Sequence, residues 1–134
     1  MPTQLFVNLP VKDLKKTVDF FTQLDFKFNP QFTDENATCM IIGENIFVML
    51  LVEKFFKTFI KKEIADANQT AEVILALSAE SREKVDEMVR KAVKAGATMP
   101  VDVQDLGFMY SHGFQDLDGH LWEVLYMDPA AAQS

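Results

Sequence analysis

The stretch FQDLDGHLWEVLYM, residues 114–127, decides the fold of this chain of 134 residues. Its Asp118-Gly119 pair predicts a tight hairpin turn, because glycine accepts the positive φ that such a turn requires. The residues after the turn, 121–127, are aromatic and branched and predict a strand. Glu123 interrupts the apolar run of that strand. A carboxylate at such a position is paired with another group, exposed at a sheet edge, or held in a cavity for use.

The first half of the chain predicts the order strand, helix, strand, strand, strand. Asp13 is a candidate N-cap for a helix whose apolar residues recur at helical spacing. A second amphipathic helix is expected over residues 54–67, with Phe55, Phe59 and Ile60 on its apolar face, and it would connect the two halves. The strands of this half are expected at residues 5–11, 26–32, 37–42 and 46–52.

The second half repeats this order. Ser81 is expected to cap a helix that Gly96 ends, and strands are expected at residues 72–79, 98–105, 108–114 and 121–127. Residues 9–18 align with residues 77–85 when one residue of slack is allowed, which indicates an internal duplication. We therefore predict an α+β fold of paired βαβββ modules whose curved mixed sheets surround a cavity. The expected single domain, residues 1–134, comprises module one at 1–52, a connector helix at 53–69 and module two at 70–128.

Composition excludes several classes of protein. The formal net charge of −7 argues against a nucleic-acid surface, which needs clustered lysine and arginine. No apolar run has the length of a membrane span, so no membrane partner is expected. A single cysteine, Cys39, has no partner for an internal disulfide. These features predict a cytoplasmic protein.

Three stretches carry a resemblance to a known family. VKDL at 11–14 with VDFF at 18–21 resembles that family's opening strand and helix, and AVKAGA at 92–97 resembles the end of its second helix. FQDLDGHLWE at 114–123 resembles its closing Asp-Pro-Asp-Gly-x-x-Trp-Glu hairpin, with Leu117 where proline is usual. Together they resemble the glyoxalase, bleomycin-resistance and extradiol-dioxygenase group, or vicinal oxygen chelate superfamily, and especially its uncharacterised lactoylglutathione-lyase-like members.

The resemblance also implies where a metal would be bound. In the metal-using members of the group, four strands each send one ligand into the shared cavity. These positions correspond to Phe6, Met49, Ile74 and Glu123. Only Glu123 suits a hard divalent cation, because Phe and Ile have no donor atom and a thioether prefers soft Cu(I). Catalytic metals usually have three or more protein ligands, so the resemblance implies that the inherited site is lost and that no cofactor is bound.

An alternative alignment, shifted by two residues, preserves the face of each strand. Asn8 and Glu72 would then replace Phe6 and Ile74, and a rebuilt divalent-metal site would combine them with His112 and Glu123. The structural alternatives are a turn position for His120 and an ordinary strand position for His112.

Without a metal, Glu123 would act as a general acid or base or would hold a polar group of a ligand. The structural alternative is an internal carboxylate bonded to Tyr110, His112 or a backbone N–H. Cys39 has no basic neighbour in sequence and is expected to pack as a small apolar residue. We predict further ligand contacts at Phe6, Asn8, Phe47, Met49, Ile74, Tyr110 and His112.

Three functions follow as hypotheses. The first is a homodimeric member of the group that binds a small, largely apolar molecule without metal, as its drug-sequestering members do. The second is a metal-dependent enzyme, either a lyase or isomerase that acts on a thiol adduct or an extradiol-type dioxygenase. The third is an interaction module whose helix at 54–67 serves dimerisation. The sequence leaves open whether the protein is an enzyme.

Overall fold

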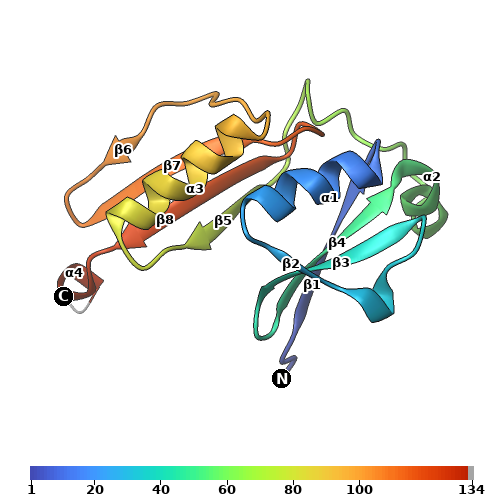
Figure 1. The fold of residues 1–134 in the computed structure, drawn as a ribbon, viewed down its shortest axis with the longest axis horizontal. Helices are drawn as coiled ribbons and strands as arrows, with labels where there is room; N and C mark the ends of the chain where they lie inside the picture. Colours follow the sequence, from blue (N-terminus) through green and yellow to red (C-terminus); the bar gives the residue numbers. More distant parts are fainter. Residues whose placement is uncertain (133–134) are drawn as a thin grey trace. The chain divides into compact units, whose positions relative to one another are not determined.

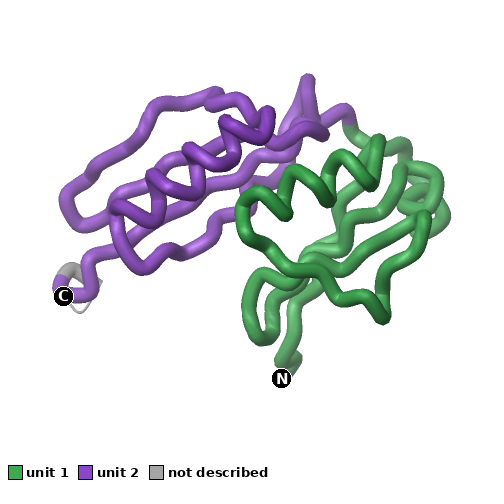
Figure 2. Tube along the Cα trace, viewed as in Figure 1, with its two compact units in different colours: residues 1–65 green, residues 66–134 purple. Residues whose placement is uncertain are grey.

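A computed structural model of the protein describes residues 1–132. The chain divides into two compact units, Met1–Ala65 and Asp66–Ser134, here called unit 1 and unit 2 (Figure 2). Each unit contains one four-stranded sheet, and neither sheet closes into a barrel. No helix in the described residues is long and apolar enough to cross a membrane. The organisation of both units into one domain stays a prediction.

Unit 1 has the predicted βαβββ order, and its strands are arranged β1-β4-β3-β2 (Figure 1). Strand β1 runs parallel to β4, and the other neighbours are antiparallel. The elements are β1 (Leu5–Val11), α1 (Leu14–Gln23), β2 (Lys27–Asn29), η1 (Pro30–Phe32), β3 (Ala37–Gly43) and β4 (Ile46–Val52).

Helix α1 begins where the sequence predicts. The Asp13 carboxylate accepts the backbone N–H of Lys16 at 3.1 Å, which satisfies one of the free donors of the first turn. Thr17, Phe20 and Phe21 are the buried residues of the helix, at the spacing of a single helix face. In β1, Leu9 and Val11 are buried, whereas Phe6 and Asn8 lie on the opposite, exposed face of the strand.

Unit 2 repeats the architecture of unit 1, with its strands arranged β5-β8-β7-β6 and β5 parallel to β8 (Figure 1). This repetition confirms the predicted duplication. The elements are β5 (Ile74–Ser78), α3 (Arg82–Lys94), β6 (Gln104–Asp105), β7 (Met109–Gln115), β8 (Leu121–Met127) and α4 (Pro129–Ala132).

Helix α3 also begins and ends at the predicted residues. The Ser81 hydroxyl accepts the backbone N–H of Lys84 at 3.1 Å, and Gly96 follows the helix with a φ of 118°. The helix packs along β7 and β8, as Figure 1 shows. Trp122 and Val124 of β8 are buried, so this face of the sheet forms the core of unit 2.

The predicted connector helix over residues 54–67 is wrong. The structure has a short helix α2 (Glu53–Phe56) and a 3-10 turn η2 (Lys57–Phe59), after which Ile60 is extended. Among the described residues no side chain caps the N-terminus of α2 at Val52, and aromatic and β-branched residues are poor helix formers. Thr58 also donates its hydroxyl to the Phe55 carbonyl at 2.7 Å. The apolar spacing alone does not sustain a helix here.

The predicted strand over residues 98–105 is also shorter than expected. It consists of a single bridge between Thr98 and Gln115 and the two-residue strand β6. Pro100 lies between them, and proline has no N–H to donate to a neighbouring strand.

Candidate functional site

Glu123 lies on the face of the unit 2 sheet opposite helix α3. Strand side chains alternate between faces, and its neighbours Trp122 and Val124 are buried in the core. The strand register places Ala76 of β5 and Gly113 of β7 on either side of Glu123. Because both neighbours are small, the carboxylate is flanked by open space on the sheet surface.

That space belongs to a cavity of about 470 Å³, here called the unit 2 cavity. Its floor is formed by residues of β5, β7 and β8, including Ile74, Leu121 and Glu123. Two connecting segments form its walls, residues 67–71 on one side and residues 100–104 on the other. Every lining residue belongs to unit 2, and the volume is within the range of small-molecule sites.

Glu123 is half-buried, and within residues 1–132 its carboxylate has no hydrogen bond or ion pair. The predicted internal partners lie elsewhere. The Tyr110 hydroxyl donates to Asp86 of α3 at 2.7 Å. His112 is paired with Val124 in the strand register, so its side chain lies on the same face as α3. The carboxylate is therefore available to a molecule in the unit 2 cavity.

The β7–β8 turn is built around Asp116, which the sequence analysis did not single out. One carboxylate oxygen accepts the backbone N–H groups of Asp118 at 2.9 Å and His120 at 3.0 Å. The other oxygen accepts the Trp122 indole N–H at 2.8 Å. Burial raises the pKa of Asp116, and His120 and the three N–H donors act in the opposite direction. The only sequence signal was the motif Asp-x-Asp-Gly-x-x-Trp, in which the first Asp reaches the Trp.

Gly119 joins this turn to one wall of the unit 2 cavity. Its φ of 91° is in the left-handed region that favours glycine. A Cβ at this position would lie 2.8 Å from backbone atoms of Ala67 and Asn68. Gln115 also donates its side-chain N–H to the Asn68 side-chain oxygen at 3.3 Å. The turn therefore holds the wall at residues 67–71 by direct backbone contact.

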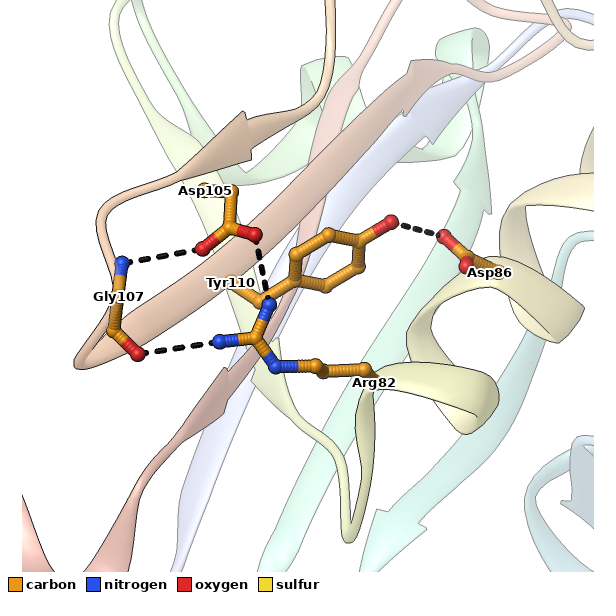
Figure 3. A network of polar contacts seen from close by, with 5 residues as sticks. All are labelled: Arg82, Asp86, Asp105, Gly107 and Tyr110. Atoms are coloured by element: carbon orange, nitrogen blue, oxygen red, sulfur yellow. Dashed lines mark hydrogen bonds and ion pairs between the residues drawn. The ribbon is translucent and has the colours of Figure 1, made fainter.

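Arg82 anchors the chain just after the opposite wall, through the contacts with Asp105 and Gly107 that Figure 3 shows. One guanidinium nitrogen donates to the Asp105 carboxylate at 2.8 Å, and another donates to the Gly107 carbonyl at 3.0 Å. The Arg82 hydrogen bond lowers the pKa of Asp105, and the Gly107 N–H adds to this effect. Asp105 follows Gln104 of the wall in β6, so the first residue of α3 helps to place the cavity wall.

The same network predicts an unusual titration of Tyr110. The hydrogen bond to Asp86 raises the pKa of Tyr110, and burial adds to the effect. In Tyr126→Phe protein, ultraviolet absorbance should therefore show the remaining tyrosine titrating above its ordinary value near 10. Stability contributed by the neutral phenol should be complete below that ordinary value and be lost as pH rises through the raised pKa. Adding Asp86→Asn should lower the midpoint. An unchanged midpoint would contradict the hydrogen bond.

The predicted site residues of unit 1 share one face of its sheet. The Phe6 and Phe47 rings are stacked, with centroids 5.0 Å apart, and Asn8 is the register partner of Met49. Cys39 is paired with Met49 on the neighbouring strand and is only 2% exposed. Burial raises the pKa of the Cys39 thiol, which agrees with its predicted role as a small apolar residue. Ligand contacts at the other four positions stay a prediction.

The residues at the four positions that the family resemblance assigns to metal ligands do not fit a catalytic divalent metal. Phe6 and Ile74 carry no donor atom and Met49 offers only a thioether, so Glu123 alone suits such an ion. The rebuilt set does not come together either, because His112 and Glu123 lie on opposite faces of the sheet. In the described part of the chain, no three His, Cys, Asp or Glu side chains are grouped so that they could hold a metal.

Two βαβββ units with the same strand order, the second closed by a hairpin that ends in Trp-Glu, define a duplicated glyoxalase-like fold. Residues 3–124 match the family model described as the Glyoxalase/Bleomycin resistance protein/Dioxygenase superfamily. The chain belongs to this superfamily, which confirms the resemblance seen in the sequence. No curated protein matches the chain.

Solved structures agree with this assignment. Hypothetical protein SA1046 from S. aureus is 30% identical, with a TM-score of 0.80 over 94% of this chain and 95% of that one. Fosfomycin resistance protein FosX from Mesorhizobium loti is 15% identical, with a TM-score of 0.71 over 100% of both chains. FosX from Listeria monocytogenes is 22% identical, with a TM-score of 0.67 over 94% of this chain and 91% of that one. At these lower identities the FosX proteins share the fold alone with this chain.

Proposed function

We propose that the protein binds a small, largely apolar organic molecule in the unit 2 cavity, with Glu123 holding a polar group of that molecule. The observation that carries this proposal is the Glu123 carboxylate, which lies in the cavity floor without a partner in the described residues. The homodimer and the cytoplasmic location expected from the sequence stay predictions.

The cavity floor suits a ligand with an apolar body. Ile74 is 58% exposed and is paired with Leu121, two register positions along the strands from the pair formed by Ala76 and Glu123. Covering such side chains would contribute roughly 25 cal/mol for each Å² of apolar surface removed from water. A hydrogen bond to a charged group typically adds about 1.5–3 kcal/mol and fixes orientation. Burial of apolar surface would thus provide most of the affinity, and the hydrogen bond to Glu123 would fix the orientation of the ligand.

We also propose that binding proceeds without the inherited metal of the superfamily. The chemistry of the residues at the four inherited positions supports this, since only Glu123 is a hard oxygen donor. The rival metal-dependent lyase or dioxygenase would need ligands from elsewhere. His112, which the sequence offered as one of them, lies on the opposite face of the sheet from Glu123.

Metal analysis and ligand screening test the proposal together. Protein purified without chelators should contain well below one equivalent of Fe, Ni, Zn or Mn. A library of small apolar compounds should yield ligands that raise the melting temperature, with a shift that grows with the logarithm of their concentration once it exceeds Kd. Glu123→Gln should lower the affinity for these ligands, because an amide oxygen is a poorer hydrogen-bond acceptor than a carboxylate oxygen.

Glu80→Gln provides the matched control, because Glu80 is exposed, lies outside the unit 2 cavity and loses the same charge. It should leave ligand affinity unchanged. If the unaltered protein instead contains one equivalent of metal and the Glu123→Gln variant loses it, the result would support the metal-dependent enzyme and end the proposal.

A further inference from the structure

We infer that the group held by Glu123 is a cation, so that the ligand is an amine or guanidinium carried on an apolar body. This inference rests on the proposed function of the unit 2 cavity and specifies the chemical class of its ligand.

The charges that line the unit 2 cavity are of one sign. Glu123 lies in its floor and Asp102 in one wall, and the described residues that line it include no lysine or arginine. His112 also borders the cavity, but the strand register places its side chain on the α3 face. The protein as a whole carries a formal charge of −7. An anionic ligand would meet two carboxylates and no compensating cation, whereas a cation would be attracted by both.

The chemistry of the floor leads to the same ligand class. An ionised carboxylate only accepts hydrogen bonds, so its partner must donate. Charge-assisted hydrogen bonds are about twice as strong as neutral ones. Ala76 and Gly113, the neighbours of Glu123 in the strand register, present no polar side chain that could compete for it. A ligand cation would therefore be a stronger partner for Glu123 in this cavity than a neutral donor.

The strand register also sets the distance between the two parts of the ligand. Leu121 and Glu123 lie on the same face of β8, two residues apart. A strand rises by about 3.3 Å per residue, which separates the apolar floor from the carboxylate by roughly 7 Å. Val101, which is 62% exposed, belongs to the wall at residues 100–104. The ligand should therefore carry its cation on a short alkyl chain that extends from its apolar body.

Three matched probes test this inference: 3-phenylpropylamine, 3-phenylpropanol and 3-phenylpropanoate, which differ only in their polar end. Amide chemical shifts of Gly113, Glu123 and residues 67–71 would report binding in the cavity, and titration would give each Kd. The amine should bind roughly tenfold more tightly than the alcohol, as one charge-assisted hydrogen bond implies, and the carboxylate should bind most weakly. Of the three probes, only the amine should bind more weakly when salt is added.

Glu123→Gln should raise the Kd of the amine by roughly tenfold to a hundredfold. The Kd of the alcohol should change by less than about threefold. Glu80→Gln, with the same loss of charge outside the cavity, should leave all three affinities unchanged. If the alcohol or the carboxylate binds as tightly as the amine, the cation inference is overturned while the proposed function stands. If Glu123→Gln spares the amine, the cation inference is overturned and so is the role of Glu123 in the proposed function. If no probe shifts the cavity amides, the proposed function fails and this inference fails with it.

Discussion

Replacing Asp116 with alanine is expected to lower the free energy of unfolding by about 3 kcal/mol or more, because three N–H donors lose their acceptor at once. Asp116 is only 6% exposed, so water has little access to the donors left behind. They are the backbone N–H groups of Asp118 and His120 and the Trp122 indole N–H. Urea denaturation followed by Trp122 fluorescence would measure the loss, since Trp122 is the only tryptophan of the chain.

Asp34→Ala is the matched control for this experiment. The Asp34 carboxylate also accepts two backbone N–H groups in a turn, those of Asn36 and Ala37, at 2.8 and 3.0 Å. Asp34 is exposed, so water can replace it, and the loss should be about 1 kcal/mol. Equal losses for the two variants would show that the buried indole bond contributes nothing beyond an ordinary turn contact.

Replacing Gly119 with alanine should have the second large effect, a loss of about 2–4 kcal/mol. The positive φ alone costs an L-residue roughly 1–2 kcal/mol. The added Cβ would also lie 2.8 Å from the backbone of Ala67 and Asn68, which cannot yield as a flexible side chain would. The wall at residues 67–71 should therefore move. Amide chemical shifts of those residues and the affinity of 3-phenylpropylamine should both change.

Gly107→Ala separates the two causes. Gly107 has a positive φ of 81°, but within residues 1–132 no atom beyond its chain neighbours lies within 4 Å of the position that a Cβ would take. This variant should therefore show only the cost of the backbone conformation, about 1–2 kcal/mol, without shifts at residues 67–71. If both variants lose the same stability, the close contact between Gly119 and the cavity wall has no energetic role.

The elements that the sequence predicted well are those determined by near neighbours. Asp13 and Ser81 cap their helices through N–H groups three residues away, and Gly96 ends α3 by its own conformation. The strands at residues 5–11 and 121–127 were found with their observed bounds. In each case the deciding atoms lie within a few residues along the chain, where a sequence pattern can reveal them.

The candidate site was only partly accessible to the same reasoning. Glu123 stands out in the sequence as the one acidic residue in an apolar strand. The anchoring of Asp105 by Arg82, 23 residues away, leaves no local signal. Ligand contacts at Tyr110 and His112 stay a prediction, and the register between β7 and β8 places both side chains on the face that carries α3. Strand alternation gives two faces, and sequence alone does not say which one faces the helix.

The sequence by itself determined the duplicated βαβββ order, the helix ends and the β7–β8 turn, because periodicity, caps and glycine conformations are local properties of a chain. Only the tertiary structure decided that Glu123 has no partner in the described residues, that Asp116 accepts the Trp122 indole, and that Gly119 contacts the segment at residues 67–71. Such facts depend on which strands pair, in which register, and on what packs against the resulting face. Those choices minimise the free energy of a whole unit, so no single stretch of residues encodes them.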